Sequence, residues 1–239
     1  MPDDMTRLRW NRKPTPQHPL MGLTILAVED SRFASEALRL AAMRSGARLR
    51  RADCLASARR HLSVYRPAVL LVDLGLPDGC GTELIAEQRD GDIDPPIILA
   101  MSGDDAGEAR ARQAGADGFL AKPLPGLAGF QAAILSHLPE DAHPSGPRPA
   151  DMSAMEPDAL ALREDLQRAA LALETMGQGS KAAYAAQFVA SVARSAEDNG
   201  LIEAANRFAR SHADGQDVDH AHGDLRRILA ARLAETRAL

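Results

Sequence analysis

Aromatic residues and cysteines are scarce in this chain of 239 residues. Phe, Trp and Tyr make up 3% of it, whereas hydrophobic residues as a whole make up 45%. Because alanine supplies much of the hydrophobic share, we expect helices to dominate. The two cysteines, Cys54 and Cys80, form no CxxC pair. This spacing indicates neither a disulfide framework nor a zinc site, and it favours a reducing cytoplasmic location.

Long hydrophobic runs and a strong excess of basic charge are also missing. No run reaches the roughly 18 apolar residues that indicate a membrane-spanning helix. The N-terminal stretch MPDDMTRLRWNRKPTPQHP lacks the apolar core of a signal peptide, so we expect a cytoplasmic protein without a membrane partner. The net charge is −5, and neither half of the chain has the basic excess of a dedicated nucleic-acid binder. Nucleic acid is therefore not expected as a partner.

Residues 22–140 alternate short apolar runs with longer amphipathic segments. The runs predict strands, and two of them are almost continuously apolar, as in the centre of a parallel sheet. The predicted strands are 23–29, 48–53, 68–73, 96–101 and 118–122. The predicted helices are 31–45, 55–65, 81–90, 104–115 and 124–138. These five units predict an α/β fold, a flavodoxin-like doubly wound five-stranded parallel sheet.

The rest of the chain has a different character. Residues 1–21 are predicted to be a flexible N-terminal arm, and residues 141–155 a linker rich in Pro and polar residues. Residues 156–239 carry apolar residues at three- and four-residue spacing, which predicts a small all-α domain of three or four helices. We expect a first helix over 156–176, a second from Ser180, a third after Asn199 and Gly200, and a fourth containing Leu225 and Leu229.

Polar side chains follow the predicted strands at their carboxyl ends. They are Glu29 and Asp30 after the first strand, Asp73 after the third, Ser102 after the fourth and Lys122 after the fifth. Ligands gather at this edge of an open α/β sheet. Three converging carboxylates repel one another unless a cation neutralises them, and oxygen ligands point to Mg²⁺. Asp73 then becomes a carboxylate nucleophile for a phosphoryl group whose oxygens contact Lys122 and Ser102.

The motifs around these positions resemble the receiver domain of bacterial two-component response regulators. The resemblance covers about residues 22–140 and rests on LAVEDS, VDLGLPDGCG, LAMSG and GFLAKPL, each after a predicted strand. It implies that Asp73 is the phosphoacceptor and that Ser102 and Lys122 contact the phosphoryl oxygens. It also implies a cis peptide bond between Lys122 and Pro123.

The same resemblance implies a metal site and a conformational switch. Asp30 would bind Mg²⁺ directly, with Glu29 beside it or acting through water, and Asp73 would be a further ligand. The backbone carbonyl of Gly75 would supply another ligand. Ser102 and Phe119, which takes the place of the family's rotating aromatic, would form the switch.

The implied function is that of a response regulator in a phosphorelay. A histidine kinase or phosphotransfer protein would donate the phosphoryl group, and the chain would turn over no external substrate. We expect residues 156–239 to act as an interaction or dimerisation domain, because the leucine stripe of helix 156–176 is long enough to seek a partner surface. A downstream protein would receive the signal, and helix 156–176 would pack on the receiver or on a second copy of the chain. We expect phosphorylation to shift this packing through the face formed by residues 104–138.

Two other outputs stay open. One is a DNA-binding transcriptional regulator with a divergent helical output domain. A modest basic cluster would support it, formed by Arg207, Arg210, Arg226 and Arg227. Aspartates lie close to these arginines in the sequence, however, and favour a solvated helix face instead. The other is a phosphotransfer or phosphatase output. No phosphotransfer motif follows His212, His220 or His222, which we therefore expect to be exposed polar residues.

Overall fold

The computed structural model describes residues 13–91, 96–104, 106–146, 158–174 and 180–236. Contacts divide the chain into two compact units. The first comprises Met1–Asp30 and Ala37–Glu156, and the second comprises Ser31–Glu36 and Pro157–Leu239. The segment Ser31–Glu36 thus belongs, by its contacts, to the unit that contains the C-terminal helices. The predicted domain boundaries stay predictions, and the predicted arm and linker lie partly outside the described residues.

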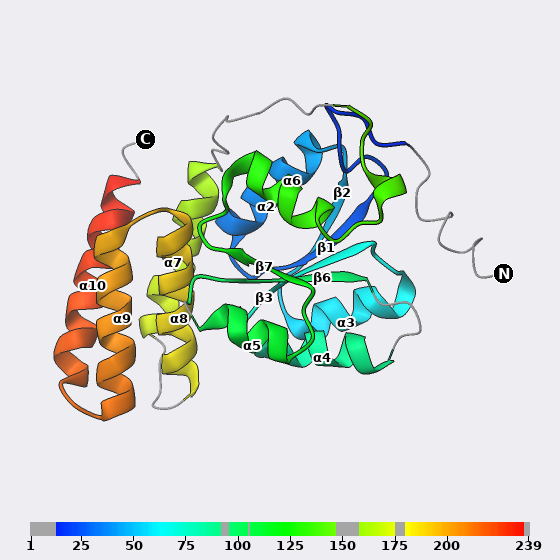
Figure 1. The fold of residues 1–239 in the computed structure, drawn as a ribbon. Helices are drawn as coiled ribbons and strands as arrows, with labels where there is room; N and C mark the ends of the chain where they lie inside the picture. The colour runs from blue at the N-terminus through cyan, green and yellow to red at the C-terminus, as the bar shows by residue number, and fades with distance from the viewer. Residues whose placement is uncertain (1–12, 92–95, 105, 147–157, 175–179, 237–239) are drawn as a thin grey trace. The chain divides into compact units, whose positions relative to one another are not determined.

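The first unit is built on a five-stranded parallel sheet (Figure 1). The strands are β1 (Thr24–Val28), β2 (Arg48–Ala52), β3 (Val69–Asp73), β6 (Ile97–Ser102) and β7 (Gly118–Ala121). Their order is β2-β1-β3-β6-β7, and every pair in the sheet is parallel. The predicted flavodoxin-like fold is therefore confirmed, and each strand lies within one or two residues of its predicted range.

Helices cover both faces of this sheet (Figure 1). They are α2 (Arg32–Arg44), α3 (Leu55–Val64), α4 (Gly81–Gly91), α5 (Gly107–Gln113), α6 (Gly126–Leu135) and the short 3-10 helix Glu140–Ala142. The helix predicted over 104–115 is too long at its start. Asp104 instead forms a turn, in which its side chain accepts a hydrogen bond from Ala106 N and its carbonyl accepts one from Gly107 N.

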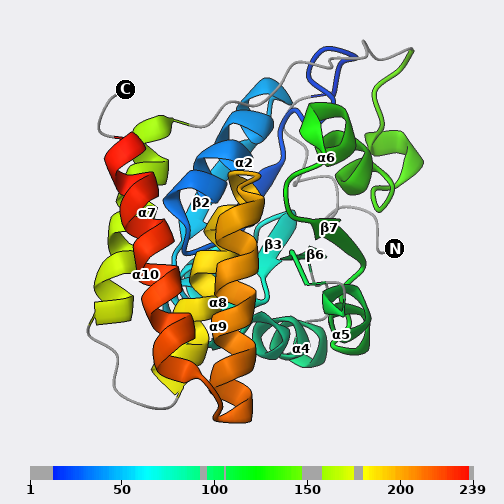
Figure 2. The same ribbon diagram turned by 90° about the vertical axis from the view of Figure 1, so that its left-hand side faces the viewer.

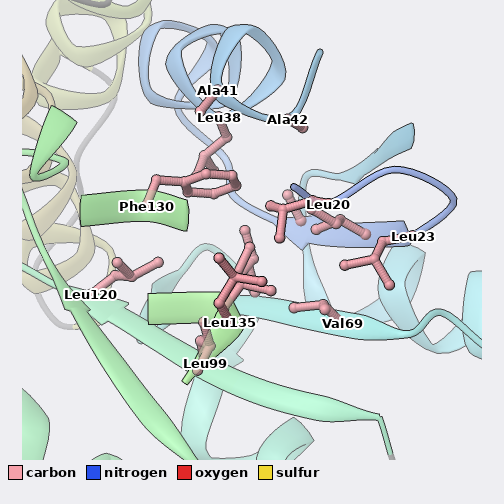
Figure 3. Packing of buried hydrophobic residues seen from close by; sticks show 14 of the residues in the cluster. Leu20, Leu23, Leu38, Ala41, Ala42, Val69, Leu99, Leu120, Phe130 and Leu135 are labelled. Atoms are coloured by element: carbon pink, nitrogen blue, oxygen red, sulfur yellow. The ribbon is translucent and has the colours of Figure 1, made fainter. Parts of the chain in front are cut away.

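Successive side chains along each strand point to opposite faces of the sheet, so two separate hydrophobic layers form. Leu71 and Met101 face the layer that contains α2 and α6, whereas Leu70, Val72 and Ala100 face the layer that contains α3, α4 and α5. Figure 3 shows the first layer, where side chains from α2 and α6 meet residues of the sheet. All five residues of β3 are buried because this strand lies at the centre of the sheet, with helices on both sides.

A small hairpin after β3 was not predicted from the sequence. Its strands β4 (Gly75–Leu76) and β5 (Gly79–Cys80) pair antiparallel. Between them, the Asp78 carboxylate accepts hydrogen bonds from the backbone amides of Leu55 (2.8 Å) and Ala56 (2.9 Å) at the start of α3. These bonds satisfy free amides of the helix and hold the loop that follows Asp73 in place.

The second unit contains α7 (Ala159–Glu174), α8 (Ser180–Ser195), α9 (Asn199–Asp214) and α10 (Val218–Glu235). Each helix packs on the next, and α10 closes back on α7 (Figure 2). The shared core includes Leu166, Phe188, Val192, Leu201, Phe208 and Leu225. The third helix begins earlier than predicted, since the side chain of Asp198 accepts a hydrogen bond from Leu201 N and caps it. The predicted end of the first C-terminal helix, residue 176, lies outside the described residues.

Within the described ranges, none of the helices combines the length and the apolar character that crossing a bilayer requires.

We predict that Gly81→Ala destabilises the first unit by about 2 kcal/mol or more, as overpacking of a tight contact does. A Cβ at Gly81 would lie 2.1 Å from the carbonyl oxygen of Asp73. The start of α4 would then have to move away from β3. Urea unfolding monitored by circular dichroism measures the change.

The matched control is Gly91→Ala at the other end of α4, where a Cβ would meet nothing within 4 Å. This variant should be neutral or slightly more stable, because Ala favours a helix over Gly. Equal stabilities for the two variants would contradict the packing argument.

Candidate functional site

The carboxyl ends of the central strands bring three acidic residues together. Glu29 and Asp30 directly follow β1, and Asp73 is the last residue of β3. All three are buried, and one carboxylate oxygen from each lies within 4.8 Å of the others. Parallel pairing of β1 with β3 aligns the two strand ends, which is why residues about 44 positions apart converge.

Lys122 brings an opposite charge into this cluster. It follows β7, and its Nζ lies 2.7 Å from Glu29 Oε2 and 3.0 Å from Asp73 Oδ2. Burial disfavours the charged ammonium, but the carboxylates of Asp73 and Glu29 outweigh this and raise the pKa of Lys122 above its ordinary value. Lys122 therefore stays protonated. The Lys122–Pro123 peptide bond is cis, as expected from the sequence.

The acidity of Glu29 is strongly perturbed. Its burial raises the pKa of its carboxyl group from 4.5 to about 8, the attraction of Lys122 lowers it, and the nearby charges of Asp73 and Asp30 raise it further. One lysine thus does not compensate for three carboxylates held this close together. A cation in the cluster would supply the missing positive charge.

The donor set of the cluster fits a hard divalent metal ion. Its ligand atoms are carboxylate oxygens, one from each of the three side chains. Such a set suits Mg²⁺ or Ca²⁺ rather than a metal that prefers sulfur or imidazole. Glu29, Asp30 and Asp73 are therefore the residues that would hold it.

Ser102 and Phe119, the predicted switch residues, lie on the two neighbouring strands. Ser102 ends β6, directly after the residue that pairs with Asp73, and its hydroxyl oxygen accepts a hydrogen bond from Asp104 N at 3.1 Å. Phe119 lies half-buried on β7. A Cβ at Gly107 would lie 2.8 Å from Ser102 Cβ and 3.4 Å from Phe119 Cζ. The glycine therefore lets the start of α5 approach both residues.

Gly75, the predicted carbonyl ligand, opens β4 two residues after Asp73. Its pairing with Cys80 in the hairpin, together with the hold of Asp78 on α3, determines the path of this loop. The ligand role of Gly75 stays a prediction.

Sequence reasoning missed Arg51, which supports the acidic cluster from β2. Its guanidinium donates to the carbonyl oxygens of Glu29 (3.1 Å from Nε) and Asp30 (2.9 Å from Nη2). The two bonds fix the backbone that carries both carboxylates. A basic residue near the end of the strand next to β1 was the available signal, but RLRRA contains three arginines and the sequence does not distinguish the one that contacts this backbone.

The expectation of exposed histidines in the C-terminal helices is wrong for two of them. His220 is exposed, whereas His212 and His222 are half-buried. The His222 ring lies 5.5 Å from the ring of Phe208, and its Nε2 lies 3.1 Å from the carbonyl oxygen of Leu173. His222 is thus a packing residue between helices, which its spacing in the sequence did not reveal.

Comparisons with known proteins agree with the geometry of the first unit. A family model described as the response regulator receiver domain matches residues 25–133. The KDP operon transcriptional regulatory protein KdpE of Escherichia coli (strain K12) is 32% identical over 125 residues, which cover 52% of this chain and 55% of that protein. The transcriptional regulatory protein PhoP of Escherichia coli O157:H7 is 29% identical over 103 residues, 43% of this chain and 46% of that protein.

Solved structures resemble the same part of the chain. The crystal structure of a response regulator signal receiver domain from Bermanella marisrubri has 30% sequence identity and a TM-score of 0.41, and the match covers 47% of this chain and 92% of that one. The chain spans about half the length of the curated relatives named above. The C-terminal helices are left without an assigned family.

We predict that the metal-free protein loses stability as the pH rises from about 4.5 to about 8. In this window the folded chain retains a proton on Glu29 that the unfolded chain has already released, so unfolding is favoured by up to about 1.4 kcal/mol per pH unit. Asp30, Asp73 and Lys122 are the charged groups that face this carboxyl group. Urea unfolding in the presence of EDTA across this range measures the loss, and Glu29→Gln should remove this part of the slope.

The control for this prediction is Glu87→Gln on α4. The hydrogen bond and charge of Arg59 lower the pKa of Glu87, so its titration affects stability only at more acidic pH. This variant should keep the wild-type slope above pH 5. A slope that Glu29→Gln leaves unchanged would contradict the assignment.

Proposed function

Residues 25–133 belong to the response regulator receiver domain family, and on this basis we propose that the chain is a phosphorelay response regulator phosphorylated on Asp73. The observation that carries the proposal is the buried contact of Asp73 with Lys122 beside the carboxylates of Glu29 and Asp30. Receiver domains are signalling domains that histidine kinases phosphorylate. A histidine kinase or a phosphotransfer protein is therefore the proposed donor.

The proposed reaction is a phosphoryl transfer between side chains. A carboxylate oxygen of Asp73 attacks phosphorus, the P–N bond of the donor phosphohistidine breaks, and its electron pair returns to the imidazole. Lys122, already 3.0 Å from Asp73, and Ser102 at the end of β6 would contact the phosphoryl oxygens. Mg²⁺, held by Glu29, Asp30, Asp73 and the carbonyl of Gly75, would offset the negative charge that accumulates there.

Other parts of the proposal follow from this chemistry. Ser102 and Phe119 would form the switch, with Gly107 leaving room for both. The chain would modify only itself and turn over no external substrate. We propose a receiver over 22–140, a linker over 141–155, an output domain over 156–239 and an arm over 1–21. We also propose a cytoplasmic location, because both cysteines are free thiols and the cytosol keeps thiols reduced.

The output that the relatives favour is transcriptional. KdpE and PhoP are both named as transcriptional regulatory proteins, which weighs against our expectation that nucleic acid is not a partner. These names support the DNA-binding alternative better than signalling through protein–protein contacts alone. We therefore propose a DNA-binding output, for which α9 and α10 carry four exposed arginines, Arg207, Arg210, Arg226 and Arg227.

One observation favours a protein-binding output as the second candidate. Three of these exposed arginines pair with acidic side chains, Arg207 with Glu203, Arg226 with Glu174 and Arg227 with Asp224. Pairing of this kind reduces the positive field that attracts a phosphate backbone. A downstream protein or a second copy of the chain would then be the partner.

We predict that Asp73→Asn reduces phosphorylation by radiolabelled acetyl phosphate with Mg²⁺ to background, because a carboxamide cannot form an acyl phosphate. Filter binding and intact-mass measurement detect the modification. Asp53→Asn, which changes an exposed aspartate just after the neighbouring strand β2, is the matched control and should keep wild-type labelling. Label retained by the Asp73 variant would show that the phosphoacceptor is another residue.

We predict that the full chain selects specific duplexes from a random-sequence DNA pool, with tighter binding in the presence of beryllofluoride and Mg²⁺. The logarithm of the affinity should fall with the logarithm of the salt concentration by about 0.9 for each phosphate contact. Mobility shifts at several salt concentrations measure this slope, and Arg227→Gln should reduce it by roughly 1. A chain that enriches no sequence with or without beryllofluoride would contradict the DNA-binding output.

A further inference from the structure

Asp165 on α7 is a fully buried charge in the second unit. Its Oδ2 accepts hydrogen bonds from the hydroxyl of Ser31 (2.7 Å) and the backbone amide of Phe33 (2.9 Å). Its Oδ1 accepts one from the backbone amide of Arg32 (3.0 Å). Burying a carboxylate is costly unless it is paired and hydrogen-bonded, so a group with this many donors indicates a built contact.

The contact forms the N-terminal cap of α2. This helix begins at Arg32, so the amides of Arg32 and Phe33 have no partner within the helix. Asp165 accepts from both, and the hydroxyl oxygen of Ser31 accepts from Ala34 N at 3.0 Å. A negative charge at this end also interacts favourably with the helix dipole. The start of α2 is therefore capped by a residue about 130 positions further along the chain.

Neighbouring side chains hold Asp165 in its orientation. Arg168 Nη2 lies 3.0 Å from Asp165 Oδ1, and the guanidinium of Arg168 lies over the ring of Phe188 on α8 at 5.3 Å. Asp165 is thus oriented by the helical bundle itself. The cap depends on the packing of α7 against α8 and not on a single flexible side chain.

The capped segment directly continues the acidic pair of the candidate site. Ser31 is bonded through one peptide to Asp30, one of the residues that would hold the metal ion. Arg51 holds the carbonyl oxygens of Glu29 and Asp30, and Asp165 holds the amides that follow. The backbone from Glu29 to Phe33 is therefore fixed from both sides of Asp30.

We propose that Asp165 is a positioning residue for the phosphorylation site, through which the C-terminal helices stabilise the metal-binding conformation of the Glu29–Phe33 backbone. The inference rests on the proposed function of that site. By thermodynamic reciprocity, metal or a phosphoryl group bound at the site must change the strength of the Asp165 cap by the same factor. The helical unit then senses the site through the first turn of α2.

The first test compares the Mg²⁺ affinity of the full-length wild type with that of Asp165→Asn by isothermal titration calorimetry. In Asp165→Asn an NH₂ group replaces one of the two carboxylate oxygens. This group cannot accept the hydrogen bonds donated to that oxygen, so the cap is partly lost. The apparent metal affinity falls in proportion to the fraction of molecules whose backbone is in the metal-binding conformation. We expect about a tenfold weaker affinity, the size of a lost helix cap.

The matched control is Glu164→Gln, one residue earlier on α7. Glu164 forms an exposed pair with the side chain of Arg32 (2.6 Å) and does not cap the backbone. Exposed pairs contribute little, so this variant should stay within about twofold of the wild type. Equal Mg²⁺ affinities for the Asp165 and Glu164 variants would overturn the proposal.

A second readout separates positioning from a general loss of stability. Hydrogen exchange of the Arg32 and Phe33 amides should accelerate in Asp165→Asn, and in the wild type it should change on addition of Mg²⁺ and beryllofluoride. Exchange that responds to neither change would overturn the coupling. If Asp165→Asn does not fold, Arg168→Gln replaces it in both measurements. Arg168 holds Asp165 in its orientation, so this variant should weaken the cap and lower the Mg²⁺ affinity by about threefold.

These outcomes differ from a failure of the proposed function. If acetyl phosphate does not label Asp73 in the wild type, the proposed function is wrong whatever the Asp165 variants do. If the wild type is labelled and the Mg²⁺ affinity and amide exchange of Asp165→Asn are unchanged, only the positioning role is wrong.

Discussion

The buried pairing of one lysine with two carboxylates holds the candidate site together. Lys122 Nζ contacts both Glu29 and Asp73, and these residues stand at the ends of β7, β1 and β3. Removing Lys122 would leave Asp73 buried without this partner, and breaking a buried ion pair in this way costs about 3–5 kcal/mol. The three residues meet only if the strand order, the register and the loop after each strand are all correct. The sheet and its two hydrophobic layers are therefore what brings Lys122, Glu29 and Asp73 together.

The backbone between β1 and α2 connects the acidic cluster to the helix start that Asp165 on α7 caps. Its carbonyl groups are held by Arg51 and its amides by Asp165, while Glu29 and Asp30 project their carboxylates into the cluster. A short segment thus carries both the proposed metal ligands and the start of a helix that is capped by another part of the chain. Asp30 and Ser31 share one planar peptide unit, so the proposed metal ligand and the capped turn are covalent neighbours.

Local patterns were enough to predict most of the fold. The apolar run before Asp73 predicted a central strand, and the order of strands and helices predicted the parallel sheet. The hairpin Gly75–Cys80 was missed because two-residue strands have no periodicity. The late start of α5 was missed because the turn at Asp104 competes with the helix through its own side chain.

The amino-acid sequence by itself determined which residues end the strands, and so that Glu29, Asp30, Asp73 and Lys122 would share one edge of the sheet. Strand ends follow from local alternation and from turn residues, which are written along the chain. Only the tertiary structure decided that Arg51 fixes the acidic backbone, that His222 is a packing residue and that Asp165 caps α2. These contacts join residues far apart in the chain, and a side chain's partner across such a distance depends on packing that local spacing does not encode.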